Sequence, residues 1–207
     1  ENAIINGGMQ VQQNPTAITL TNAYQYGIAD QWCLAVSGGT SISGIDAISS
    51  GNAGVSTGVL YGTTSGSWTT GQFTWMQRIE AKRTIRFNSK VVTVQAKIYQ
   101  NTGGARSFNV LLYKPTTTAD TFSATTLLQT VTATQSVASG TITTITATFA
   151  ALGATDASLG LQAVILDSAA NTVSSKTYLI GDVKLEEGSA ATQFESGGAY
   201  HQYQPLT

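Results

Sequence analysis

Several stretches of the chain alternate apolar and polar residues with a period of two, and this pattern most strongly limits the possible folds. Such alternation is typical of β-strands with one buried face. The alternating stretches are residues 92–99, 107–113, 144–149, 159–165 and 179–185, the last interrupted by Gly181. Turn sequences separate them, and long patterns of helical period do not occur. We therefore expect an all-β fold, an antiparallel β-sandwich of the jelly-roll type.

Three other regions lack a clear alternation. Residues 73–86 begin like a strand, but their end is compatible with a helical turn. Residues 37–71 are richest in glycine and serine, which predicts long exposed loops. Hydrophobic periodicity is weak over residues 115–138. We expect one jelly-roll domain over residues 1–195, followed by a C-terminal tail over residues 196–207.

The composition supports a β fold and excludes several classes of partner. Charged residues make up only 10% of the 207 residues, against about a quarter in average proteins. Threonine and glycine, which favour strands and turns, supply much of the polarity. The net charge of −1 and the absence of a long apolar run predict neither nucleic-acid binding nor membrane insertion. We interpret the basic residues between positions 78 and 90 as a solvated turn, partly neutralised by Glu80.

Cysteine and histidine are too scarce to build most reactive sites. Cys33 is the only cysteine, so no intrachain disulfide can form, and we expect it to be a small buried residue. His201 is the only histidine, and no Gly-x-Ser-x-Gly turn accompanies it. Glu186 and Glu187 are adjacent, so in a strand they would face opposite sides and form a poor acid pair. We expect no catalytic residues and no enzyme activity.

The two ends of the chain carry strand-like runs bounded by glycine, over residues 2–11 and 181–195. We expect these runs to pair as the first and last strands of the sandwich.

Four motifs, in order along the chain, carry a resemblance to a known family. They are residues 6–13 (Asn-Gly-Gly-Met-Gln-Val-Gln-Gln), 26–32 (Tyr-Gly-Ile-Ala-Asp-Gln-Trp), 76–84 (Met-Gln-Arg-Ile-Glu, then Arg-Thr) and 183–195 (Val-Lys-Leu-Glu-Glu-Gly-Ser-Ala-Ala-Thr-Gln-Phe-Glu). The set resembles a surface domain of bacteriophage tail fibres and head fibres. Gln12 departs from the family pattern, which usually has Trp there, and aromatics are usual where Ala96 and Lys97 stand.

The resemblance implies a galactose-binding-like jelly roll, similar to carbohydrate-binding modules. It also implies a place on the extracellular surface of a virion. The implied partners are copies of the chain in a homotrimer, other virion proteins and a host-surface polysaccharide. Jelly rolls of this type often hold a structural Ca²⁺ beside the first and last strands, where Asp182 and Gln10 stand here. Few charged oxygen ligands remain at that place, and no other cofactor is expected.

Sugar binding by such modules relies on exposed aromatic rings and on polar side chains that complete the hydrogen bonds. Trp68 lies in a polar Thr/Ser/Gly stretch and is the first candidate contact, followed by Tyr61, Tyr24 and Tyr26. Trp68 could equally cap the sandwich or contact a neighbouring subunit. Trp32 and Trp75 lie in strand-like segments, and we expect both in the core.

These observations lead to two hypotheses of function. The first is a non-catalytic virion surface fibre domain that binds a host-cell-surface glycan. The alternative is a structural capsid-decoration or fibre-base protein that anchors a fibre without binding a ligand. A depolymerase is disfavoured, because no acid pair can be recognised.

Overall fold

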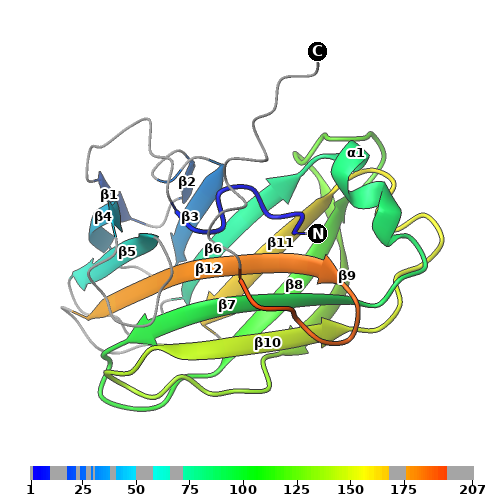
Figure 1. The fold of residues 1–207 in the computed structure, drawn as a ribbon. Helices are drawn as coiled ribbons and strands as arrows, with labels where there is room; N and C mark the ends of the chain where they lie inside the picture. Colours follow the sequence, from blue (N-terminus) through cyan, green and yellow to red (C-terminus); the bar gives the residue numbers. More distant parts are fainter. Residues whose placement is uncertain are drawn as a thin grey trace.

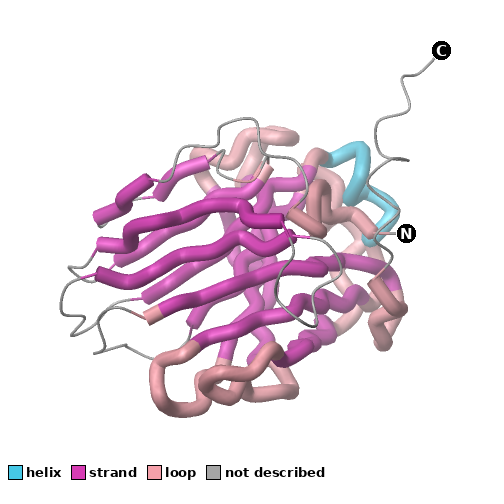
Figure 2. Tube along the Cα trace, turned by 60° about the vertical axis from the view of Figure 1, so that its left-hand side comes forward, coloured by secondary structure: helices cyan, strands magenta, loops and turns pink. Residues whose placement is uncertain are grey.

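The computed structural model describes residues 2–9, 18–21, 24–26, 29, 31–37, 41–49, 58–65, 72–167 and 176–194. Within this part, twelve strands form two six-stranded antiparallel sheets that pack face to face (Figures 1 and 2). The predicted antiparallel β-sandwich is therefore confirmed. No described helix has the length and apolar character that crossing a membrane requires.

The first sheet has the strand order β1-β4-β5-β12-β7-β10. Its strands are β1 (Ile18–Thr21), β4 (Ser41–Ser49), β5 (Gly58–Ser65), β12 (Thr177–Glu187), β7 (Val92–Gln100) and β10 (Thr143–Phe149).

The second sheet has the order β2-β3-β6-β11-β8-β9. Its strands are β2 (Tyr24–Tyr26), β3 (Trp32–Ser37), β6 (Gln72–Ile79), β11 (Leu161–Asp167), β8 (Phe108–Pro115) and β9 (Thr125–Thr132).

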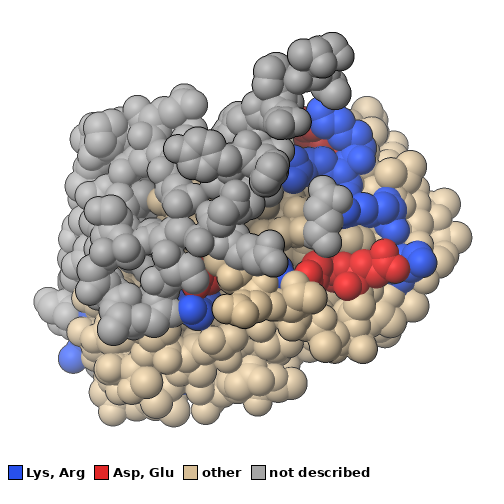
Figure 3. Space-filling view, viewed as in Figure 1, with Lys and Arg blue, Asp and Glu red and all other residues tan. Residues whose placement is uncertain are grey.

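A short helical turn follows β6, as the sequence of residues 73–86 allowed. It consists of α1 (Ala81–Thr84) and the 3-10 turn η1 (Ile85–Phe87). Lys and Arg side chains gather at the end of the molecule that carries α1 (Figure 3). Lys82 forms a solvent-exposed ion pair with Glu80 at 3.2 Å, as the interpretation of a solvated turn predicts, whereas Arg78 lies within β6.

The core lies between the sheets and combines many aliphatic side chains with a cluster of aromatic rings. Trp75 packs edge-on against Phe73 at a centroid distance of 4.5 Å, and the ring of Tyr178 stacks on Phe73 at 4.7 Å. Phe108 stacks on Trp75 at 6.1 Å. Trp32 is buried as well, so both Trp32 and Trp75 lie in the core as expected. Aromatic pairs in these geometries add stability beyond the area that they bury.

A buried polar network closes one end of this core. Asp167 accepts two hydrogen bonds from the Arg106 guanidinium, both at 2.9 Å, and one from the Tyr178 hydroxyl at 2.8 Å. Asp167 and Tyr178 are fully buried. A buried carboxylate is tolerated because these charged and polar donors replace its water.

The region over residues 37–71 departs from the expectation of long loops. Residues 41–49 and 58–65 form β4 and β5, so the prediction is wrong for these two segments. The register between β4 and β5 shifts between Ser43 and Asp46, which marks a bulge. A bulge inserts an extra residue into the strand, so β4 does not keep the period of two over its length.

The opening segment also differs from its prediction. Residues 2–9 are not a strand, and Asn6 and Met9 have positive φ values of 53° and 51°. The segment nevertheless lies along β12, as expected from the pairing of the chain's ends. Ala3 N donates to Leu185 O at 2.8 Å, and Val183 N donates to Gly7 O at 2.9 Å. Because β5 pairs with β12 only over residues 177–180, residues 2–7 cover the edge that β5 leaves open.

Candidate functional site

The outer face of β7 and β10 is lined by polar side chains. Thr93, Gln95 and Lys97 alternate along β7 with the buried residues of the core. They stand opposite Thr148, Thr146 and Thr144 of β10. Successive strand residues point to opposite faces, so the alternation that buries the core of β7 also builds this polar surface.

A short segment after β12 folds back across this face. We call residues 188–194 the strap (Figure 1, orange to red after β12). The Thr93 hydroxyl donates to Gly188 O at 2.6 Å, and the Thr148 hydroxyl donates to Ser189 O at 3.3 Å. The strap therefore crosses from β12 over β7 to β10.

Two buried, oppositely charged side chains hold the middle of the strap. Lys184 and Glu186 form an ion pair at 3.1 Å and are only 5% and 4% exposed. The Lys184 ammonium donates to Thr192 O at 3.0 Å, to Gln193 O at 3.1 Å and to the Thr192 hydroxyl. Glu186 Oε1 accepts from Thr192 N at 2.5 Å, and Oε2 accepts from the Thr192 hydroxyl at 2.9 Å.

The surroundings of Glu186 favour its ionised form. Burial is the largest single influence and raises the pKa of Glu186. The Thr192 amide and the Lys184 ammonium together outweigh it, so the pKa lies below its usual range.

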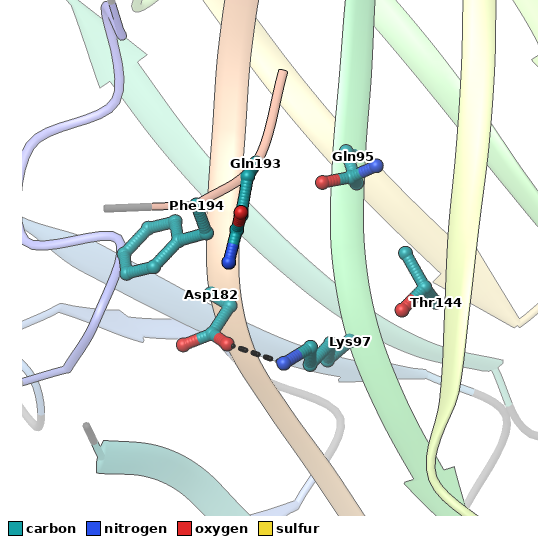
Figure 4. A pocket seen from close by; sticks show the side chains of 6 residues that line it. All are labelled: Gln95, Lys97, Thr144, Asp182, Gln193 and Phe194. Atoms are coloured by element: carbon teal, nitrogen blue, oxygen red, sulfur yellow. Dashed lines mark ion pairs between the residues drawn. The ribbon is translucent and has the colours of Figure 1, made fainter. Parts of the chain in front are cut away.

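Beside the end of the strap lies a hollow of about 240 Å³. Gln193 extends from the strap toward the sheet, whereas the Phe194 ring turns to the side of β12 opposite Gln95 and Thr144 (Figure 4). The described residues that line it are Gln95, Lys97, Thr144, Asp182, Gln193 and Phe194. The hollow therefore combines one aromatic ring with amide, hydroxyl, carboxylate and ammonium groups.

An ion pair forms one side of the hollow. Lys97 Nζ lies 2.9 Å from Asp182 Oδ2, and the two side chains are 27% and 1% exposed. Asp182 has a φ of 49° and lies where the register between β12 and β7 shifts, between Gly181 and Lys184. Bulges of this kind redirect side chains and recur next to functional sites.

In the described residues, no group of metal ligands gathers around Asp182, where the family resemblance allowed a structural Ca²⁺. Ca²⁺ takes six to eight oxygen ligands, whereas Asp182 is paired with the Lys97 ammonium. No group of three or more acidic, histidine or cysteine side chains suited to a metal occurs in the described part of the chain. Gln10, the other predicted ligand, lies outside the described residues.

The four predicted sugar contacts are not brought to the hollow in the part that the structure describes. Trp68 lies outside the described residues. The backbone of Tyr61 lies in β5, opposite Leu179 of β12. Tyr24 and Tyr26 lie in β2, on the other sheet. Tyr24 is 67% exposed and remains available as a contact there.

Tyr26 belongs to a packed cluster on the second sheet. The guanidinium of Arg78 lies over the Tyr26 ring at 5.1 Å and over the Phe122 ring at 5.5 Å. Burial raises the pKa of Tyr26 to about 12 and that of the neighbouring Cys33 to about 11. Cys33 is buried, as expected, and remains a thiol at neutral pH, so it is not poised as a nucleophile.

Sequence reasoning missed most of the hollow, although signals for it were present. Gln95 and Lys97 lie on the polar side of a recognised alternation, and Phe194 lies in the last motif. What the sequence did not reveal is that the strap folds back over β7.

Each carboxylate whose side chain is described already has a hydrogen-bond or ion-pair partner. Glu187, for example, pairs with Lys90 at 3.2 Å at the exposed end of β12, whereas Glu186 lies on the outer face beneath the strap, so the two adjacent residues face opposite sides as predicted. The full set is Glu80, Asp120, Asp156, Asp167, Asp182, Glu186 and Glu187.

Comparisons with known proteins place the fold but no family. No family model matches the chain, and no curated protein matches its sequence. A cyclase from Fischerella sp. TAU, solved with 4-(1H-indol-3-yl)butan-2-one, has a TM-score of 0.54 at 15% identity, over 93% of this chain and 100% of the cyclase. A structure of carbohydrate-binding modules of the β-sandwich superfamily, which addresses their promiscuous specificity, has a TM-score of 0.50 at 11% identity, over 89% and 64%.

A third match is to N-terminal modules of endo-1,4-β-D-xylanase 10B from Clostridium thermocellum, complexed with xylohexaose. It has a TM-score of 0.47 at 15% identity over 79% of this chain, which spans only 27% of the xylanase chain. Identities this low show a shared fold alone. The chain therefore has a sandwich of the type found in carbohydrate-binding modules, and that fold also serves an enzyme, so function has to be argued from the site.

Proposed function

We propose that the chain is a non-catalytic carbohydrate-binding domain of a virion surface fibre and that it binds a host-cell-surface glycan. The observation that carries the proposal is the hollow under the strap. It brings Phe194 and Gln193 of the strap together with the Gln95 amide, the Thr144 hydroxyl and the Lys97–Asp182 ion pair on a polar sheet face.

These groups match the chemistry of a pyranose. A sugar ring presents apolar C–H groups on its faces and hydroxyl groups around its rim. The Phe194 ring offers a surface for the face, while Asp182 accepts and Lys97 donates hydrogen bonds at the rim. The Gln95 and Gln193 amides can do both. The volume of about 240 Å³ lies below the usual range for drug-sized ligands, which suits one sugar unit of a longer chain.

The charge balance favours a neutral sugar. The charge of Lys97 is compensated by Asp182 at 2.9 Å. An acidic sugar would bring a second negative charge close to Asp182, and like charges in a partly buried site repel each other. We therefore propose a neutral hexose unit rather than a uronate.

The state of the carboxylates supports binding without catalysis. Glycoside hydrolysis requires one carboxyl group that donates a proton and a second that acts as base or nucleophile. Asp182 is the acidic residue among the described lining residues, and it is ion-paired.

The fibre context is supported by the four ordered motifs. A fibre context implies an extracellular position on a virion, assembly as a homotrimer and contact with other virion proteins. The alternative of a purely structural protein has its own support. Tyr24 and Leu127 are exposed on β2 and β9, the two edge strands of the second sheet, and exposed apolar side chains at such edges suit protein contacts.

Calorimetry with neutral gluco-, manno- and galacto-hexasaccharides, and with polygalacturonate as the acidic comparison, tests the proposal. We expect saturable binding of a neutral hexasaccharide and about a fivefold or greater loss of affinity in Phe194→Ala, because a buried ring contact is worth about 1 kcal/mol or more. Tyr24→Ala is the matched aromatic control on the other sheet and should bind like the wild type. A larger loss in Tyr24→Ala than in Phe194→Ala would reject the hollow, and no binding of any saccharide would favour the structural alternative.

A further inference from the structure

The buried pair of Lys184 and Glu186 lies beside the hollow but is not part of its lining. Removing two charges from water costs free energy, and the pair's own attraction does not fully offset that cost unless further hydrogen bonds satisfy both groups. Here the strap supplies those bonds through the Thr192 amide and hydroxyl and through the carbonyls of Thr192 and Gln193. The charged groups are therefore directed at the strap.

The strap depends on these side chains for its position. Backbone pairing with the sandwich extends to Gly188, whose N–H donates to Val91 O at 2.9 Å. Beyond Gly188, the described hydrogen bonds to the sheet are made with side chains, those of Thr148, Lys184 and Glu186. The bond from Thr148 is long, at 3.3 Å, whereas those to the charged pair are shorter, and charge-assisted bonds are about twice as strong as neutral ones.

Anchoring at Thr192 and Gln193 also places the next residue. Consecutive Cα atoms are about 3.8 Å apart, so fixing the Gln193 carbonyl leaves Phe194 little room to move. Gln193 and Phe194 are the two lining residues that the strap contributes to the hollow.

We propose that Lys184 and Glu186 are positioning residues of the sugar site: they hold the strap on the sheet so that Phe194 and Gln193 complete the hollow. This role rests on the proposed function. Neither side chain touches the sugar, and both act through the strap. Two of the six described lining residues are therefore carried by a segment that this ion pair holds on the sheet.

The test compares Glu186→Gln, Phe194→Ala and the double variant, with Glu187→Gln as the matched control. The control makes the same chemical change one residue away, in an exposed pair with Lys90. Hydrogen exchange of peptides from the strap reports its position, and exchange of β7 peptides reports the integrity of the sheet. Calorimetry uses the gluco-, manno- and galacto-hexasaccharides. Lys184→Met, which removes the ammonium and keeps the stem, repeats the test from the other partner.

We expect strap exchange about ten- to a hundredfold faster in Glu186→Gln, with β7 exchange unchanged, because a hydrogen bond to a charged group is lost. Affinity should fall at least about tenfold. In the Phe194→Ala background, Glu186→Gln should lower the affinity by less than about a further twofold, because the two residues act as one unit. Glu187→Gln should match the wild type in both assays.

Two results would overturn the positioning role. One is strap exchange in Glu186→Gln that stays at the wild-type rate. The other is a loss of affinity that multiplies fully with that of Phe194→Ala, since Glu186 would then act independently of the ring. If the wild-type protein binds none of the hexasaccharides, the proposed function is wrong and the positioning role falls with it. In that case the exchange data still show whether Glu186 holds the strap, but not that the strap builds a sugar site.

Discussion

Removal of the Tyr178 hydroxyl tests how much the buried network at the end of the core contributes to stability. Tyr178→Phe deletes the donor of the 2.8 Å bond to Asp167 but keeps the ring that stacks on Phe73. The change leaves no cavity larger than a hydroxyl. Arg106 still neutralises Asp167 through its two bonds at 2.9 Å. The substitution therefore isolates one hydrogen bond to a charged acceptor.

Such a bond is worth about 1.5–3 kcal/mol, which sets the expected loss in the free energy of unfolding. For a chain of this size, each kcal/mol lowers the melting temperature by about 2–4 °C. The expected decrease for Tyr178→Phe is then about 3–12 °C. Asp167→Asn should cost more, about 3–5 kcal/mol, because it leaves the Arg106 guanidinium without its carboxylate.

Urea unfolding followed by tryptophan fluorescence measures both variants, with the slope m expected to stay constant. Tyr113→Phe is the control, because Tyr113 lies half-exposed on the outer face of β8, and it should change stability by less than about 0.5 kcal/mol. If Tyr178→Phe also stays within about 0.5 kcal/mol of the wild type, the reasoning that this network stabilises the core through Tyr178 is refuted.

Three further predictions concern β12 and its contacts. Gly7→Ala should lower stability by about 1–3 kcal/mol in urea unfolding, because an added Cβ would lie 2.1 Å from Val183 O. Lys97→Met should lower it by about 1–3 kcal/mol by the same assay, since Asp182 is left buried without its cation; the partial exposure of Lys97 reduces the cost from that of a fully buried pair. Because the pKa of Glu186 is lowered in the folded protein, its ionised form stabilises the folded state above the usual glutamate pKa of about 4.3. This contribution is lost as the pH falls through the lowered pKa of the folded state. The stability difference between the wild type and Glu186→Gln should therefore shrink toward zero in unfolding titrations taken progressively below pH 4.

Each of these predictions has a matched comparison. Gly104→Ala places a Cβ in open space and should be neutral, so equal losses at Gly7 and Gly104 would contradict the steric argument. Lys90→Met removes a lysine from an exposed pair with Glu187 and should cost less than Lys97→Met. A stability gap between the wild type and Glu186→Gln that widens on acidification would have the wrong sign for a carboxylate with a lowered pKa.

The strands that were predictable from sequence are those with one face in the core and the other in solvent. In β7 and β10, every second residue is buried, and the alternation in the sequence matches the burial along both strands. β9 was obscure because it is an edge strand whose residues are all partly or fully exposed, and only Leu128 and Val131 pack against the core. β4 was missed because its bulge shifts the register between Ser43 and Asp46.

The candidate site was less predictable because it depends on contacts between segments far apart in the sequence. Lys97 and Asp182 meet through the pairing of β7 with β12 at a bulge, and no local pattern announces a bulge there. Phe194 reaches the hollow because the chain reverses after Gly188. The adjacency of Glu186 and Glu187 correctly predicted that they face opposite sides, but the last motif contained no signal for where the strap would lie.

The attachment of both residues 2–7 and the strap to one short stretch of β12 has a mechanical consequence. The first segment binds along the edge of residues 183–185, and the strap binds across Lys184 and Glu186. A tensile force applied through these two segments would enter and leave the sandwich within four residues, so the ladders between the other strands would carry no load. In a fibre under tension, the anchors on β12 would therefore yield before the sheets take up the load.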